Sequence, residues 1–295
     1  MNKMQQLFCC VPDVKLISFD ACRTLNFGNT HYLKAEQMNN HIQHIMDADG
    51  VLFPQYWQVN SLIYGLKKRI FPSAASYHIG HDKVEMTRCF TAVAPANVPW
   101  TIIDANTPYA AEQAWDAMPL PFVAKIPKSS MGEGVFLIEN RQDWRKYLEK
   151  TPVIYVQECL PIDRDLRIIW AGDCIVGGYW RLQAEQGFYN NLARGGSAET
   201  GILPPEACAL VTRLATELGI NHGGFDIAMV DRHPYVFEFN RIFGNQGVPG
   251  IQQKVDQAIT EYLLREWGFS EPENPDSPES APVSPFPGTQ TPFAV

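Results

Sequence analysis

The chain has 295 residues, of which 45% are hydrophobic and 19% are charged, and its formal net charge is −8. This length is enough to bury a large core and predicts about two domains. The acidic balance and the lack of a basic run argue against nucleic acid or an acidic membrane surface as a partner. The seven cysteines contain no C-x-x-C pair, which is typical of reduced thiols, and no stretch approaches the roughly 18 apolar residues that cross a bilayer. We therefore expect a soluble, cytoplasmic protein.

The first 80 residues alternate between strand-like and helix-like segments. Short strands are predicted at 14–20 and 49–54, and helices at 32–46 and 57–68. Strands that alternate with helices favour a small parallel sheet. Residues 1–80 are therefore predicted to form an N-terminal α/β domain.

Three histidines in this region raise the question of a metal site. His41 and His44 lie three residues apart on a predicted helix, where they can share one ligand, and His31 precedes them. No carboxylate or cysteine completes the set, so we interpret all three as exposed histidines.

The next segment, 81–160, is predicted to begin a second domain. Asp82 is a suitable N-cap, and Glu85 three residues later completes an approximate capping box for a helix that ends near residue 94. A strand over 98–104 and a helix over 108–117 follow. Beyond them the composition becomes richer in strand-forming residues.

Lys125 lies inside a predicted strand, FVAKI, and is followed by a loop rich in serine and glycine, PKSSMGEG. A lysine in a strand core is unfavourable unless it is paired, and the amide groups of such a loop can surround phosphate oxygens. The loop matches neither the P-loop nor the dinucleotide-binding glycine pattern. Taken alone, the segment favours a flexible hairpin whose lysine extends to solvent.

Two further segments bear on a nucleotide site. The strand VIYVQEC (153–159) runs into a proline-containing bend, where backbone groups can meet an adenine edge. LRIIWAGDCIVGGYWR is predicted to be a hairpin that turns at Gly172-Asp173. Strict register places Asp165 and Arg167 on one face and Arg181 on the other, unless a bulge at Gly177-Gly178 re-aims it.

The stretch from Gly223 to Gly247 is predicted to be a hairpin that carries oxygen ligands. Strand alternation places Tyr235, Phe237 and Phe239 on one face and Val236, Glu238 and Asn240 on the other. The hairpin can bring Asp226 beside Glu238 and Asn240. Two carboxylates and an amide suit Mg²⁺, which prefers carboxylates together with substrate phosphates. An ordinary hairpin with one buried, salt-bridged acid is the alternative.

The remaining segments are less specific. GFYNNLARGGSAET is either a surface loop or an ordered catalytic loop, and residues 204–218 are predicted to form a helix with Gly219 at its C-terminal cap. A last helix is predicted at 252–267. The tail from Glu271 is rich in proline, serine and acids and is predicted to be disordered.

Placed in order, these segments resemble the ATP-grasp superfamily, and most closely its RimK-like branch of carboxylate–amine ligases. The resemblance covers about Asp82 to Gly250. It rests on the motifs DK (82–83), VAK (123–125), SSMGEGV, VQECL (156–160), DLR (165–167), Arg181, NNLARGG (190–196), GGFDI (223–227) and FEFN (237–240).

The resemblance implies an α/β protein, α+β in its C-terminal part, with an N-terminal pre-grasp domain (1–80) and an ATP-grasp domain (81–268). Nucleotide would be held between two β-sheet subdomains, 81–160 and 161–268, and residues 269–295 would form the proline-rich tail. The resemblance assigns catalytic roles to Arg181, Lys125 and Arg167. It assigns ATP-binding roles to Lys83, Lys125, Ser130, Gly132, Gly134, Gln157, Glu158, Cys159, Leu160, Asp165, Asn190 and Asn191. Its metal ligands are Asp226, Glu238 and Asn240, for one or two Mg²⁺ ions, with Mn²⁺ as an alternative.

Within those sets, Lys83 and Lys125 would contact the phosphates, and Asp165 would hold the ribose. Arg181 would stabilise charge on the transferring phosphoryl group. The chain departs from the RimK pattern at Tyr189, where that branch has an arginine. Either Arg194 compensates for this loss or phosphate is handled differently.

The implied activity is a ligase that uses ATP to activate a carboxylate as an acyl phosphate and joins it to an amine. Its partners would be small-molecule or peptide acids and amines, and the resemblance also implies self-association. One alternative is an ATP-grasp phosphotransferase, whose product stays phosphorylated. Another is a nucleotide-binding regulatory module without turnover.

Overall fold

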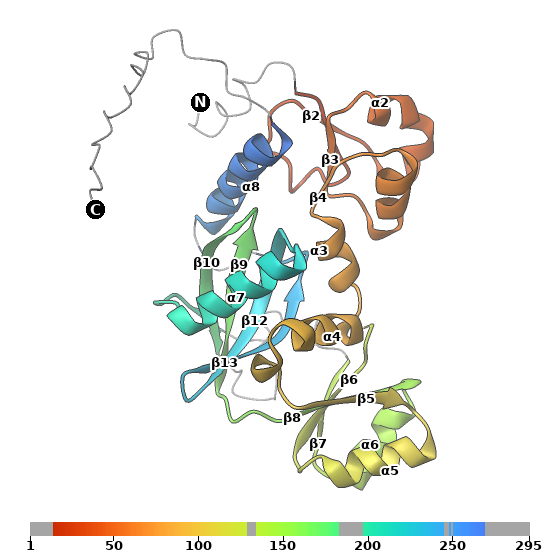
Figure 1. Cartoon of the computed structure of the whole chain (residues 1–295), viewed down its shortest axis with the longest axis vertical. Coiled ribbons are helices and arrows are strands. Elements are labelled where there is room, and N and C mark those ends of the chain that lie inside the picture. Colours follow the sequence, from red (N-terminus) through yellow and green to blue (C-terminus); the bar gives the residue numbers. More distant parts are fainter. Residues whose placement is uncertain (1–13, 129–133, 183–196, 245–247, 249, 269–295) are drawn as a thin grey trace, which may run out of the picture.

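The computed structural model describes residues 14–128, 134–182, 197–244, 248 and 250–268 (Figure 1). Their strands form three separate sheets, one four-stranded and parallel, one four-stranded and antiparallel, and one five-stranded and antiparallel. None of the helices in the described ranges is long and apolar enough to cross a membrane. The predicted tail lies outside these residues.

The first sheet is parallel, as the alternation of strands and helices predicts. Its order is β2-β1-β3-β4, with β1 at Leu16–Ser18, β2 at Thr30–Tyr32, β3 at Gly50–Leu52 and β4 at Ile70–Phe71. The short strands β2 and β4 were not predicted, because two or three residues carry too little periodicity to be recognised.

The two long helices predicted in this region are wrong. Residues 32–46 form a 3-10 helix, Ala35–His41, followed by the short α2, Ile42–Met46. Residues 57–68 form only a 3-10 turn, Tyr56–Gln58, and a π-helical turn, Ser61–Gly65. Asn60 and Gly65 are poor helix formers, and the chain turns at Lys67, where φ is +55°.

Two helices lead from the first sheet to the others. The unpredicted α3 (Ala74–Ile79) is capped by Ser73, whose Oγ accepts from the amide of Ser76 at 3.1 Å. α4 (Lys83–Val93) begins at the predicted cap, where Asp82 Oδ1 accepts from the amide of Val84 at 2.8 Å. A 3-10 turn, Pro95–Asn97, follows α4.

The second sheet has the order β5-β8-β6-β7 and is antiparallel throughout. Its strands are β5 (Thr101–Ala105), β6 (Phe122–Lys125), β7 (Val135–Ile138) and β8 (Val153–Glu158). α5 (Pro108–Ala117) and α6 (Arg141–Leu148) cover one face, at the lower end of the molecule in Figure 1. Phe122 and Trp144 pack between helices and sheet, so this unit has its own core.

The third sheet has the order β11-β10-β9-β12-β13. Its strands are β9 (Arg164–Ala171), β10 (Cys174–Leu182), β11 (Ser197–Glu199), β12 (His222–Val230) and β13 (His233–Asn240). α7 (Pro205–Leu218) ends at Gly219, whose left-handed φ of +67° fits the predicted cap. α8 (Ile251–Trp267) packs against β10 and belongs to a core cluster shared with the first sheet.

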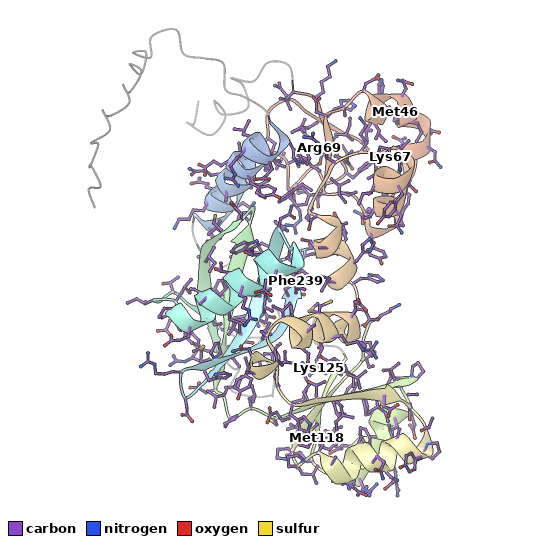
Figure 2. The ribbon with its side chains drawn as sticks, viewed as in Figure 1. Met46, Lys67, Arg69, Met118, Lys125 and Phe239 are labelled. Atoms are coloured by element: carbon purple, nitrogen blue, oxygen red, sulfur yellow. The ribbon has the colours of Figure 1, made fainter. Side chains whose placement is uncertain are left out.

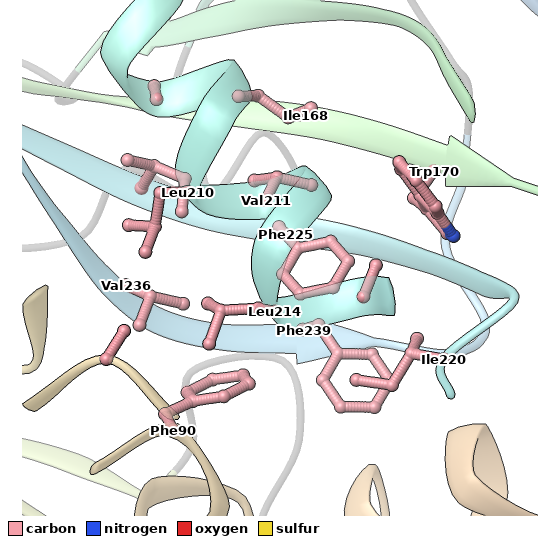
Figure 3. Packing of buried hydrophobic residues seen from close by; sticks show 14 of the residues in the cluster. Phe90, Ile168, Trp170, Leu210, Val211, Leu214, Ile220, Phe225, Val236 and Phe239 are labelled. Carbon is pink, nitrogen blue, oxygen red and sulfur yellow. The ribbon is translucent and has the colours of Figure 1, made fainter. Parts of the chain in front are cut away.

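One face of the third sheet is apolar. Leu210, Val211 and Leu214 of α7 pack on Phe225 and Ile168 of the sheet (Figure 3). Phe90 of α4 and Phe239 join the same cluster. Since one face is filled in this way, the polar side chains of β9, β10, β12 and β13 gather on the opposite face.

Candidate active site

The position of Arg181 depends on a bulge in β10. The turn pairs Ala171 with Cys174 as predicted, but the register shifts between Ile175 and Gly177. Val176 is the extra residue, immediately before the predicted glycine pair. The shift places Arg181 directly opposite Asp165, and therefore on the same face as Arg167. Both arginines thus reach one site.

A second bulge rearranges β13 and corrects the predicted alternation. The register shifts between Asp226 and Ile227 of β12, so that Phe237 has no partner and Glu238 lies opposite Asp226. Val236 and Phe239 are both in the apolar cluster. The ring of Phe237 lies 5.3 Å from Lys125 Nζ, on the polar face. Strict alternation failed here because one extra residue reverses the faces of every residue before it.

Four buried charged residues form an alternating network on the polar face. Arg181 donates two hydrogen bonds of 2.7 Å to Asp165 and lies 3.0 Å from Asp226 Oδ2. Arg167 donates to both oxygens of Asp226, at 3.1 Å from Nη2 to Oδ2. Two cations and two anions are therefore neutralised within the sheet. Burial raises the pKa of Asp165, and so does the neighbouring Asp226, whereas Arg181 and Arg167 lower it.

Lys125 is buried on the facing sheet in a different environment. It donates to Gln157 Oε1, and its Nζ lies 5.7 Å from the centre of the Tyr155 ring. Burial lowers the pKa of Lys125 to about 8; Glu238 raises it and Lys83 lowers it further. Figure 2 shows Lys125 at the end of the second sheet that is nearer to the third sheet. The ammonium is thus desolvated and held by an amide and aromatic rings.

Lys83 joins the two sheets electrostatically. Its Nζ lies 3.9 Å from Glu238 Oε2, and its backbone amide donates to Pro127 O at 3.3 Å. Asp82 therefore starts α4 in such a way that the next residue reaches β13. The structure thus brings both lysines close to Glu238.

The segment expected to contact adenine, Glu158 to Leu160, begins at the last residue of β8. Glu158 is held at the edge of the sheet, since its Oε1 accepts from the amide of Trp100 at 2.7 Å. Gln157 is buried and spans from Lys125 to Thr101 Oγ1, to which it donates at 2.9 Å. The described contacts therefore connect Gln157 to the lysine.

The candidate metal ligands lie together. Asp226 and Glu238 are cross-strand partners, and Asn240 Nδ2 lies 3.3 Å from Glu238 Oε1. The Glu238 carboxylate and the Asn240 amide therefore lie side by side on one face of the sheet, and their oxygens suit a hard cation such as Mg²⁺. Asp226 differs from them, because both of its oxygens already accept from arginines. The described residues contain no group of three His, Cys, Asp or Glu with metal-site geometry.

Several predicted residues cannot be placed. Ser130, Gly132, Asn190, Asn191, Tyr189 and Arg194 all lie outside the described ranges. Gly134 is described, and its carbonyl accepts from the amide of Ile126 at 2.7 Å. The ring contacts of Tyr155 and Phe237 with Lys125 were not predicted, since aromatic residues in strands usually indicate core.

A half-buried arginine beside the site was also missed. Arg241 follows Asn240 directly, and its guanidinium lies 4.8 Å from the centre of the Tyr77 ring. The signal available in sequence was a charged residue immediately after a candidate ligand.

Comparison with known proteins identifies the family. The model of the RimK-like ATP-grasp domain matches residues 82–265. The chain belongs to the RimK-like ATP-grasp family. This match begins at Asp82, the cap of α4, and spans both antiparallel sheets together with α7 and most of α8.

Individual relatives agree with the family assignment. A probable alpha-L-glutamate ligase of Syntrophotalea carbinolica is 29% identical over 174 residues, covering 57% of each chain. A ribosomal protein bS6--L-glutamate ligase of Escherichia coli is 30% identical over 151 residues, covering 49% of each. The chain thus spans about half the length of the curated relatives that it matches.

The fold is shared with solved ATP-grasp proteins. The D-alanine--D-alanine ligase of Bacillus anthracis superposes with a TM-score of 0.64, covering 86% of this chain and 99% of that one, at 16% identity. Identity at this level supports the fold, and the chain has the ATP-grasp architecture that its motifs imply.

Proposed function

We propose that the protein is an ATP-dependent ligase that converts a carboxylate to an acyl phosphate and joins it to an amine, releasing ADP and phosphate. The observation that carries this proposal is the placement of Lys125, on the second sheet, and Lys83, at the start of α4, close to the carboxylates Glu238 and Asp226 of the third sheet. Cations on one side and carboxylates on the other suit a polyphosphate with its metal.

In the proposed first step, an oxygen of the acid substrate attacks the γ-phosphorus of ATP. The new P–O bond forms as the bond to the β-phosphate oxygen breaks, and ADP leaves. Lys125 is positioned to neutralise charge on the phosphates without moving, because Gln157 and two rings already hold its ammonium. Arg181 and Arg167 would face the same charge from the third sheet.

In the second step, the amine attacks the acyl carbon, and a C–N bond forms as phosphate leaves with the bonding electrons of its C–O bond. The amine loses a proton to solvent or to a basic group. Mg²⁺, when bound by Glu238 and Asn240, would screen the phosphate charge. We propose that Asp165 also orients Arg181, which donates to it two hydrogen bonds of 2.7 Å, beside the ribose role that the resemblance implies.

The substrates follow from the relatives' names only as candidates. Two of them are named as L-glutamate ligases, one of which acts on a ribosomal protein. We propose L-glutamate as the first amino acid to pair with peptide acids. We also propose residues 81–268 as the ATP-grasp unit, preceded by the α/β unit of residues 1–80.

The experiment is a release assay for ADP with purified protein, ATP and Mg²⁺, screened over amino acids paired with each other and with peptides. The proposal expects ADP and a new amide, detected by mass spectrometry, only when an acid and an amine are both present. A stable phosphorylated product would instead indicate a phosphotransferase. ATP binding without turnover across the screen would indicate a regulatory module.

A further inference from the structure

The carboxyl ends of β1 and β3 mark a second place where a ligand is expected. In parallel sheets, ligands bind beyond the carboxyl ends of strands where the strand order reverses. The order β2-β1-β3-β4 puts that reversal between β1 and β3. Asp20 and Arg23 follow β1, and Phe53 and Tyr56 follow β3.

The backbone at this edge is strained. Phe53 has φ of +48°, in the left-handed region that a bulky residue rarely adopts. Residues held in such conformations cluster at active sites and ligand sites. Its ring lies 5.6 Å from that of Phe71, and Arg23 lies 6.0 Å above it. The packing therefore keeps Phe53 in this conformation and presents Arg23 beside it.

Arg241 approaches the same edge from the third sheet. Its side chain is half-buried over Tyr77. Burial raises the pKa of Tyr77, and the charges of Arg241, Asp20 and Arg23 are close enough to change that pKa as well. No carboxylate of the described residues forms an ion pair with Arg241. Burial lowers the pKa of Arg241, and the only ionisable groups of the described residues that act on this pKa are Tyr77 and Tyr56. Desolvating an arginine without a counter-ion is unfavourable.

A hydrogen bond from His222 holds the backbone of Arg241 in place. Burial lowers the pKa of His222 to about 3, so its ring is neutral. Since a carbonyl oxygen can only accept, His222 Nδ1 donates to Arg241 O, at 2.7 Å. His222 therefore positions Arg241 without adding charge.

A histidine, a tyrosine and two acids also lie at this edge. The His81 ring stacks on Tyr56 with centres 3.9 Å apart and planes at 5°. Burial lowers the pKa of His81, as do the neighbouring charges of Lys128 and Arg241. The two nearby acids already have partners: Asp20 pairs with Arg23 at 3.4 Å, and Asp82 caps α4.

We propose that Arg241, with Arg23, Tyr56 and His81, binds a carboxylate group of the substrate that is not itself phosphorylated, so that the enzyme selects an acidic amino acid or acidic peptide end. Arg241 offers a planar fork of donors that matches a carboxylate. The flat Tyr56–His81 pair offers a surface for the adjoining methylene groups. This inference rests on the proposed function, because Arg241 follows the candidate metal ligand Asn240 by one residue, or about 3.8 Å along the chain.

The test is calorimetric titration of L-glutamate and of its neutral analogue L-glutamine into the whole protein in the presence of Mg²⁺ and ADP. We expect L-glutamate to bind at least tenfold more tightly than L-glutamine. R241Q is expected to weaken L-glutamate at least tenfold, with R241K intermediate. R232Q is the matched control, since Arg232 lies in the β12–β13 turn with an exposed side chain paired to Glu206.

Equal affinity for the two amino acids, no binding of L-glutamate, or equal effects of R241Q and R232Q would overturn the inference. The comparison of ligands on the wild-type protein needs no variant, so misfolding of R241Q leaves the test intact. Selective L-glutamate binding without ADP release in the pairing screen would instead contradict the proposed ligase while supporting this site.

Discussion

Buried charge is handled differently on the two antiparallel sheets that face the candidate site. On the third sheet, Asp165, Arg181, Asp226 and Arg167 neutralise one another. On the second sheet, Lys125 has an amide and two aromatic rings around it, and no ion pair with any described carboxylate. The charges of the first arrangement are balanced without a ligand. In the second, the buried ammonium of Lys125 has no anionic partner among the described residues.

This difference indicates that an anionic ligand would be stabilised most strongly at Lys125. A buried cation without a counter-ion destabilises the folded protein, and a phosphate group would relieve that cost. A closed network of ion pairs gives shape and position, with little net stability. We infer that Lys125 supplies affinity and that the arginines supply geometry.

The largest effect is expected from breaking the paired network. Asp226→Ala leaves two arginines without their shared carboxylate, and such a loss typically costs about 3–5 kcal/mol. We expect that decrease in the free energy of unfolding, measured by urea denaturation, together with loss of turnover. Asp173→Ala is the control: its surface pair with Arg265, at 2.7 Å, is expected to contribute at most about 1 kcal/mol. Equal effects of the two substitutions would contradict the comparison.

Removing the unpaired charge should have the opposite effect on stability. The pKa of Lys125 lies at about 8 against an ordinary 10.5, a difference that corresponds to about 3 kcal/mol of destabilisation at neutral pH. Lys125→Met should therefore raise the free energy of unfolding by roughly 1–3 kcal/mol, after the lost bond to Gln157. Nucleotide affinity, measured by calorimetry, should fall at least tenfold. A less stable variant would show that Lys125 is already adequately paired.

The same lysine sets a pH dependence with a defined sign. Its pKa is lower in the folded than in the unfolded protein, so its destabilising effect is full below about pH 8 and is relieved as pH rises toward 10.5. The stability advantage of Lys125→Met over wild type should therefore shrink between pH 8 and 10.5. Thermal unfolding of both proteins across this range tests the sign, and a widening gap would contradict it.

The smallest effect is expected from supplying the missing partner. Gln157→Glu places a carboxylate against Lys125, which makes the second sheet resemble the third. The pKa of Lys125 should rise, and nucleotide affinity should fall severalfold because the carboxylate competes with phosphate. Nitrogen-15 NMR of the labelled lysine reports the pKa directly. An unchanged pKa of Lys125 would mean that the side chain at position 157 does not contact the lysine ammonium.

The sequence supported the order of the larger elements and the set of candidate ligands. Motifs such as DLR and FEFN located Arg167, Glu238 and Asn240 because their chemistry is unusual for strands. Predicting faces required register, and register depended on two bulges. The glycine pair 177–178 pointed to the bulge at Val176, whereas no residue type marked the one at Phe237. Arg241 and its ring contacts come from distant parts of the chain, which no local pattern reveals.

The claim that the protein makes an acyl phosphate is tested most directly by isotope transfer. The acid substrate is labelled with oxygen-18 in its carboxylate, and the phosphate released with Mg²⁺, ATP and the amine is analysed by mass spectrometry. The account predicts one labelled oxygen per phosphate, because the carboxylate oxygen that attacks phosphorus leaves with it. Amide formation with unlabelled phosphate would contradict the account.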